Sequence, residues 1–118
     1  MKGLLLVAHG SRLVESNNEI EVLRDKLRAG NSDFDWLDIA FLELASPQVG
    51  SQIDAAVQSG VTDLKVFPYF LAAGYHVRTD LPELLEHARD KYPDLSITLA
   101  QHLGAREELV SLILKHYD

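Results

Sequence analysis

Two histidines follow apolar runs at widely separated points of the chain. His9 follows the run 4–8, and His76 follows the apolar and aromatic segment 66–75. In parallel α/β folds, ligands bind where loops leave the carboxyl ends of the strands. Imidazole is the commonest transition-metal ligand, and it also moves protons near neutral pH. Two imidazoles brought to one sheet edge predict a metal site, although a histidine that only packs at a strand end is an equally simple interpretation of His9.

An acidic residue in an apolar segment is the third candidate for this chemistry. Glu43 is flanked by apolar residues over 41–44, and a carboxylate in such a setting is seldom buried without a partner. It suits a third metal ligand or a base, while the alternative is a carboxylate near the start of a helix. Arg12 and Arg78 lie within a few residues of the candidate histidines, where a guanidinium can hold a substrate carboxylate. Solvated surface arginines are an equally plausible interpretation of both.

The connection 68–79 has an unusual composition for a loop. Loops normally lie on the surface, yet this one is largely apolar and aromatic. Its composition predicts an interface between copies or a wall for a flat, apolar ligand, unless the loop simply folds onto the core. The candidate wall residues are Tyr69, Phe70, Leu71 and Tyr75.

The apolar pattern alternates between strand-like and helix-like segments along the chain. Apolar runs typical of buried parallel strands lie at 3–8, 36–42, 61–67 and 95–100. Each run is followed by a segment with helical spacing. The helix residues expected to face the sheet are Ile20, Leu23 and Leu27; Val49, Ile53, Ala56 and Val57; Leu84, Leu85 and Ala88; and Leu109, Leu112, Ile113 and His116.

Two of the expected helices begin with recognisable capping signals. Ser46 is the expected N-cap of the second helix, with Pro47 at the first helical position. The segment 80–83, Asp-Leu-Pro-Glu, has the form of a capping box and predicts that the third helix begins there.

Four strand–helix units predict an α/β fold with a four-stranded parallel sheet and right-handed crossovers. We expect one three-layer domain over 1–118 with the flavodoxin-like strand order 2-1-3-4. In that order, the switch point lies between the first and third strands. His9 ends the first strand and His76 follows the third, so both lie at this crevice, and Glu43 follows the second strand at the same edge. His102, after the fourth strand, is a weaker candidate at this edge.

Composition narrows the classes of function. The net charge of −7 over 118 residues argues against a nucleic-acid partner. The chain has no cysteine, so a metal ion must be held by nitrogen and oxygen ligands. The apolar run 4–8 is too short for a signal peptide or a membrane span, and we expect a cytoplasmic protein with no membrane partner. The phosphate-binding, dinucleotide-binding and nucleophile-elbow motifs are missing, which argues against those classes of protein. We expect no organic cofactor.

Four sequence segments together resemble one known family. They are the His9 motif Leu-Val-Ala-His-Gly-Ser, the segment 40–47 around Glu43, the segment 68–82 around His76, and Leu103-Gly104. In order and spacing they are similar to the short sirohydrochlorin chelatases of the CbiX type, which are related to the siroheme ferrochelatases. The segment around His102 and the pair Ala105-Arg106 depart from the usual family pattern.

The resemblance implies insertion of a divalent metal into sirohydrochlorin, on the way to cobalamin, siroheme or a nickel tetrapyrrole. Co²⁺ is the expected metal substrate, with Fe²⁺ or Ni²⁺ as alternatives. The family's motif positions imply that His9 and His76 bind the metal and remove protons, with Glu43 assisting. Longer relatives contain two such halves, so the resemblance also implies that this chain works as a homodimer.

Two other functions compete with this interpretation. A non-catalytic metal or tetrapyrrole carrier uses the same site, and only turnover separates it from an enzyme. A histidine phosphatase also begins with strand–His–Gly, but its motif requires an arginine directly before the histidine, where this chain has Ala8.

Overall fold

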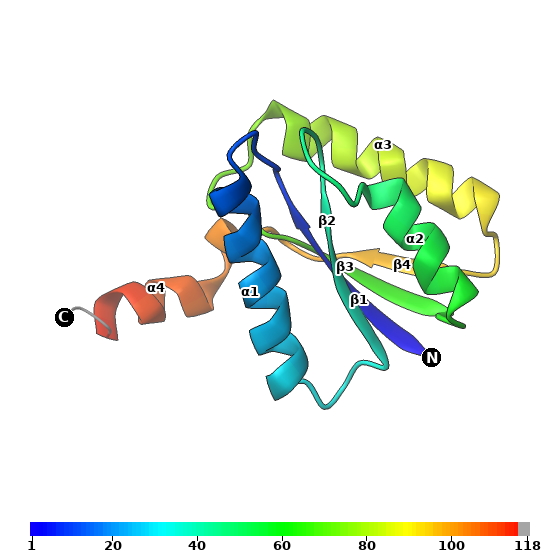
Figure 1. Cartoon of the computed structure of the whole chain (residues 1–118), viewed down its shortest axis with the longest axis horizontal. Coiled ribbons are helices and arrows are strands. Elements are labelled where there is room, and N and C mark those ends of the chain that lie inside the picture. The colour runs from blue at the N-terminus through cyan, green and yellow to red at the C-terminus, as the bar shows by residue number, and fades with distance from the viewer. Residues whose placement is uncertain (116–118) are drawn as a thin grey trace.

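The fold is a parallel sheet with helices on both faces, as the sequence predicted (Figure 1). The computed structural model describes residues 1–115, apart from the side chain of His76. The elements are β1 (Lys2–Ala8), α1 (Val14–Gly30), β2 (Trp36–Phe41), α2 (Val49–Gln58), β3 (Asp63–Pro68), α3 (Tyr75–Lys91), β4 (Ser96–Leu99), the 3₁₀ turn η1 (Leu103–Ala105) and α4 (Glu107–Lys115). Among the residues described, no helix is long and apolar enough to cross a membrane.

The strand order β2-β1-β3-β4 is the order predicted from the sequence. β1 pairs in parallel with both β2 and β3, in a register that sets Ala8 beside Phe41 and Val7 beside Pro68. Because all strands run in the same direction, the chain leaves β1, β2 and β3 at one edge of the sheet. This edge carries the candidate site.

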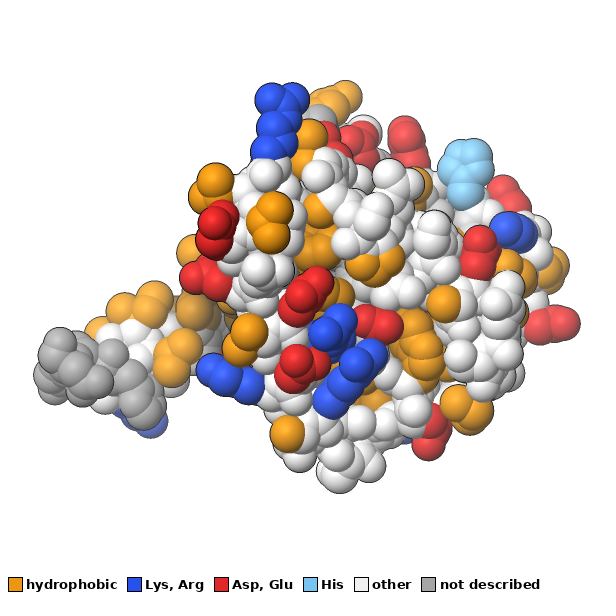
Figure 2. Space-filling view, viewed as in Figure 1, with side chains coloured by type: hydrophobic (Ala, Val, Ile, Leu, Met, Phe, Trp, Pro, Cys, Tyr) orange, Lys and Arg blue, Asp and Glu red, His pale blue; other side chains and the backbone are white. Residues whose placement is uncertain are grey.

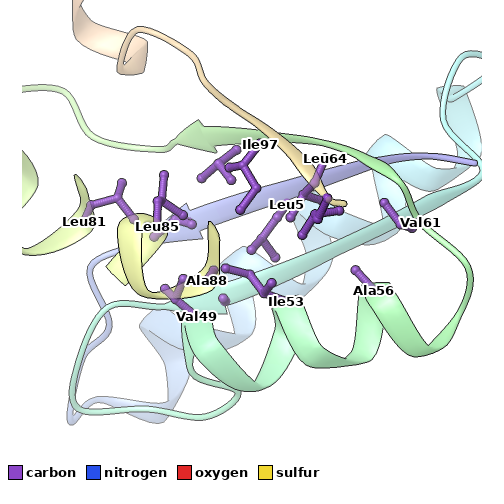
Figure 3. Packing of buried hydrophobic residues seen from close by; sticks show 14 of the residues in the cluster. Leu5, Val49, Ile53, Ala56, Val61, Leu64, Leu81, Leu85, Ala88 and Ile97 are labelled. Carbon is purple, nitrogen blue, oxygen red and sulfur yellow. The ribbon is translucent and has the colours of Figure 1, made fainter. Parts of the chain in front are cut away.

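The larger part of the core lies between the sheet and helices α2 and α3 (Figure 3). Leu5 and Leu64 come from the strands, Ile53 from α2 and Leu85 from α3, and all four are fully or almost fully buried. A smaller cluster on the other face packs β1 and β2 against α1 through Ile20, Leu23 and Leu27. The inward stripe predicted for α1 is therefore confirmed.

The predicted start of α2 is wrong. The backbone carbonyl of Pro47 accepts a hydrogen bond from Phe41 N at 2.8 Å, and Gln48 forms a β-bridge with Phe41. Pro47 is therefore held in the loop before the helix, Gln48 is extended and acts as the N-cap, and the helix begins at Val49. The segment 42–47 becomes a loop that projects Glu43 from the end of β2.

The predicted start of α3 is also wrong, because the helix begins before the capping-box segment. It starts at Tyr75 after Gly74 and includes Pro82 in its interior. Val77 packs against the core cluster and Leu81 is fully buried, and with Leu85 they form a stripe at a spacing of four residues. Burying each leucine is worth about 2 kcal/mol, which offsets the hydrogen bond that Pro82 cannot donate. Leu84, which was expected to face inward, is partly exposed, and Leu81 takes its place.

The inward face predicted for the last helix is not observed in its described part. None of the residues of α4 is buried, and Leu112 and Ile113 are largely exposed. Leu109 alone is half-buried among the predicted residues that are described, and His116 lies outside them. Figure 1 shows why: α4 extends away from the sheet instead of lying against it.

A charged cluster joins α2 to the end of α3. Asp54 Oδ1 accepts hydrogen bonds from Tyr92 Oη at 2.6 Å and Lys91 Nζ at 3.1 Å. The hydrogen bond from Tyr92, and after it the one from Lys91, hold the pKa of Asp54 below its usual value of 3.8. A lowered folded-state pKa stabilises the fold above the unfolded-state pKa, and this stabilisation is lost as pH falls through the folded-state value.

We therefore expect Asp54→Asn to lower the free energy of unfolding at pH 7 by at most about 1 kcal/mol, because Asp54 is partly solvated. Urea unfolding at several pH values measures the effect. The difference from the wild type should shrink as pH falls below about 4. A difference that stays constant from pH 7 to pH 3 would contradict this explanation.

Candidate functional site

His9 and Glu43 meet at the carboxyl edge of the sheet. His9 is the first residue after β1, and its Nε2 lies 2.9 Å from Oε1 of Glu43, which follows β2. The two side chains are 48% and 44% exposed, so the pair is open to a ligand. A neutral imidazole donates its Nε2–H to the carboxylate, and a protonated one forms an ion pair with it. Nitrogen and oxygen donors of this kind suit divalent transition metals.

Backbone contacts fix this pair. The ladder between the strands continues past their ends, with Leu42 N donating to Ala8 O at 2.9 Å and Glu43 N donating to His9 O at 3.0 Å. Gly10 has a positive φ of 96°, and a Cβ there would lie 1.8 Å from the backbone oxygen of Glu43. Only glycine permits this approach. The two loops therefore pack backbone to backbone beneath the His9–Glu43 contact.

Asn17 secures the turn that follows His9, and the sequence analysis did not identify it. Its Nδ2 donates to Ser11 O at 2.8 Å, and its Oδ1 accepts from Ser11 N at 3.1 Å. The Asn17 amide thus pairs with both the N–H and the C=O of Ser11, in the way that a residue of a neighbouring β-strand pairs with its partner. A polar residue in the first turns of a helix, shortly after a glycine-containing turn, is the only sequence signal for this role.

Phe70 supports the imidazole from the neighbouring strand. It follows β3, and its ring lies edge-on to that of His9, with the centroids 6.1 Å apart and the planes at 89°. Edge-to-face contacts of aromatic rings are favourable. Phe70 is only 9% exposed, whereas Leu71 and Tyr75 are 73% and 75% exposed. Among the predicted wall residues, Tyr69, Leu71 and Tyr75 therefore offer surface to a ligand, and Phe70 mainly holds His9.

His76 lies in the first turn of α3, and the prediction that it belongs to a long loop is wrong. The helix follows the connection 69–74, which leaves β3 at the same sheet edge as His9. Its role as a second imidazole at the site stays a prediction. Arg78, on the same turn, and Arg12, in the loop after His9, are both exposed. His102 is half-buried directly before η1, after β4, and a role for it also stays a prediction.

Among the side chains that the structure describes, no group of three His, Asp or Glu residues is arranged to hold a metal ion. The metal-ligand role of His9 and Glu43 therefore stays a prediction, and it requires further ligands from another residue or from the substrate. A hollow of about 310 Å³ adjoins Glu43 and is also lined by Asp80, Glu83 and His87. Carboxylates gathered in this way raise the local concentration of cations.

Comparison with known proteins identifies the family. The CbiX family model matches residues 3–118. The chain belongs to the CbiX family, and the resemblance seen in the sequence is confirmed. The chain is 31% identical to the sirohydrochlorin cobaltochelatase of Methanopyrus kandleri, in a match that covers 97% of this chain and 93% of that protein. It is 27% identical to a sirohydrochlorin ferrochelatase of Priestia megaterium, covering all of this chain and 44% of that protein.

Solved CbiX-type structures have the same fold. A CbiX protein from Marinobacter aquaeolei VT8 superimposes with a TM-score of 0.83 at 30% identity, covering 97% of this chain and 92% of that one. The sirohydrochlorin chelatase SirB from Bacillus subtilis, solved in complex with cobalt, gives a TM-score of 0.86 at 30% identity. That match covers 96% of this chain and 48% of SirB. The chain thus spans about half the length of SirB and less than half of the Priestia ferrochelatase.

Asn17 should matter for the site more than for the fold. We expect Asn17→Ala to weaken Co²⁺ binding about tenfold, because the turn after His9 loses its two hydrogen bonds while the core stays intact. Isothermal titration calorimetry measures the binding, and urea unfolding measures the stability. Asn18→Ala, at the exposed neighbouring position, is the matched control and should bind Co²⁺ like the wild type. Equal Co²⁺ affinity in both variants would contradict the positioning role.

Proposed function

We propose that this chain inserts a divalent metal ion into sirohydrochlorin. The observation that carries the proposal is the 2.9 Å contact between His9 and Glu43 at the carboxyl edge of the sheet. Phe70, in the connection 69–74, packs against His9, and the same connection carries the exposed residues Tyr69 and Leu71, in a chain of the CbiX family. Relatives at about 30% identity are named sirohydrochlorin cobaltochelatases and ferrochelatases, which supports Co²⁺ or Fe²⁺ as the metal substrate, with Ni²⁺ as an alternative.

The reaction has two requirements that these side chains can meet. The metal ion must lose bound water, and the macrocycle must lose two pyrrole N–H protons as the metal–nitrogen bonds form. Neutral imidazole binds such ions in place of water. Histidine is also a proton acceptor suited to neutral pH. We assign metal binding and proton removal to His9 and His76 together, with Glu43 pairing with His9 in either protonation state.

The surroundings of the pair suggest how an anionic tetrapyrrole is held. The exposed rings of Tyr69 and Tyr75 and the side chain of Leu71 offer apolar surface to the flat macrocycle. Sirohydrochlorin carries carboxylates, and the chain has a net charge of −7, so cationic groups must be placed locally. We assign this role to Arg12 and Arg78, which lie on the two segments that carry the histidines.

The number of copies that act together and the cellular compartment are also part of the proposed function. The longer relatives have room for a second unit of similar size, and we propose that two copies of this chain act together as a homodimer. We also propose that it acts in the cytoplasm, which fractionation of cells that produce a tagged chain would test.

Turnover by site variants tests the proposed reaction. Anaerobic absorbance of sirohydrochlorin with Co²⁺ should show metallation by the wild type well above the uncatalysed rate. His9→Ala and His76→Ala should each lower kcat/KM by at least about 100-fold, and Glu43→Gln by about tenfold, because each removes a ligand or a proton acceptor. Gln58→Ala, at the exposed C-terminal end of α2, is the control and should retain most of the activity.

Circular dichroism must show that every variant is folded. Unchanged turnover in both histidine variants would contradict the proposed site. Wild-type protein that binds Co²⁺ and sirohydrochlorin without turnover would instead be a carrier.

A further inference from the structure

One residue beside the candidate site has a backbone conformation that is unfavourable for its side chain. Leu44 directly follows Glu43 and has a φ of 66°. Among the residues that the structure describes, it is the only one other than glycine with a positive φ. Glycine adopts this left-handed region readily, and among other residues asparagine and aspartate adopt it most often. The backbone at this position therefore favours a residue other than leucine.

The contacts of the loop after β2 impose this conformation. The loop ends where it begins, because Phe41 N donates a hydrogen bond to Pro47 O at 2.8 Å. Within the loop, Glu43 N donates to His9 O at 3.0 Å, which fixes Glu43 against the neighbouring loop. With both ends of the loop and Glu43 held in place, the chain must turn sharply at Leu44.

The turn leaves the side chain of Leu44 on the surface. Leu44 is 54% exposed, and it belongs to neither of the two core clusters. Its side chain thus adds little to the core, although its backbone conformation is unfavourable. Unfavourable conformations that the surrounding structure maintains are concentrated at functional sites. An exposed apolar side chain next to such a site is suited to contact a ligand.

Leu44 and the apolar residues after β3 lie on opposite sides of His9. In the strand order β2-β1-β3-β4, the loop that carries His9 lies between the loops after β2 and β3. Leu44 is in the loop after β2, and Tyr69 and Leu71 are in the connection after β3. These loops leave strands that are about 10 Å apart, twice the spacing of neighbouring strands. Figure 2 shows hydrophobic side chains, interspersed with charged ones, at the end of the molecule where Figure 1 places the loops after β1 and β2.

We propose that Leu44 is a substrate-contact residue. A flat tetrapyrrole lies across His9, in contact with Tyr69 and Leu71 on one side and with Leu44 on the other. This inference rests on the proposed function, and it adds the residue that holds the macrocycle on the β2 side. Contacts on both sides centre the macrocycle over the His9–Glu43 pair.

The variant Leu44→Asn tests this contact, because asparagine accepts the left-handed backbone but lacks the apolar side chain. We expect the KM for sirohydrochlorin to rise about tenfold with little change in kcat, as for the loss of a contact made equally in the ground state and the transition state. Co²⁺ affinity by isothermal titration calorimetry and stability in urea should be no lower than in the wild type. Val22→Asn is the matched control, since Val22 is 52% exposed on α1, and it should leave KM unchanged.

The outcomes separate this contact from the proposed reaction. If the wild type metallates sirohydrochlorin and Leu44→Asn has an unchanged KM, the contact is refuted and the proposed function stands. A rise in KM with an equal loss of Co²⁺ affinity would also refute the contact, because Leu44 would then act only through the position of Glu43. If the wild type binds sirohydrochlorin without turnover, the reaction is refuted, and spectrophotometric titration should still show about tenfold weaker binding in Leu44→Asn than in Val22→Asn. A wild type that does not bind sirohydrochlorin would overturn both proposals.

Discussion

The pairing of β1 with β2 determines whether the site can form. His9 and Glu43 are far apart in the sequence, and each directly follows or lies close to the end of its strand. The register that sets Ala8 beside Phe41, and the hydrogen bonds that continue it, bring the two side chains to 2.9 Å. A slip of one residue in this pairing would turn alternate side chains to the other face. The buried residues of β1 and β2 prevent such a slip, so the core also controls the chemistry.

The rest of the site is built around this contact. Gly10 allows the loops after β1 and β2 to touch, Asn17 holds the turn, and Phe70 brings the end of β3 against the imidazole. All of these contacts lie at the carboxyl edge of the sheet, where ligands bind in parallel α/β folds. The proposed metal ligands and the proposed apolar surface for a macrocycle follow different strands of one sheet. Small shifts in strand packing are therefore expected to affect metal binding.

The sequence predicted the sheet and its order because apolar runs and helical stripes are strong, repeated signals. The runs that became β1 and β3 and the stripe of Ile20, Leu23 and Leu27 are clear examples. The starts of α2 and α3 were not predictable from capping signals, because tertiary contacts overrode them. Pro47 is held by Phe41, and Leu81 is drawn into the core despite the proline that follows it. The four-residue spacing of Val77, Leu81 and Leu85 was the sequence signal that could have corrected the predicted start of α3.

The candidate site, like the fold, could be predicted from the sequence only in part. The topology alone placed His9 and Glu43 at one edge, and the structure shows their contact. The role of Asn17 could not be predicted, since it depends on backbone groups of Ser11 that lie close to it only in the folded chain. The exposure of α4 was likewise unpredictable, because its apolar residues have the spacing of a helix that packs against its own sheet.

The central claim is that imidazoles from two distant segments bind the same metal ion. X-ray absorption spectroscopy of the protein loaded with one equivalent of Co²⁺ measures this directly, since imidazole ligands give characteristic outer-shell scattering. We predict scattering from two imidazoles in the wild type and from one in each of His9→Ala and His76→Ala. An imidazole count that is the same in the wild type and in both variants would contradict the claim.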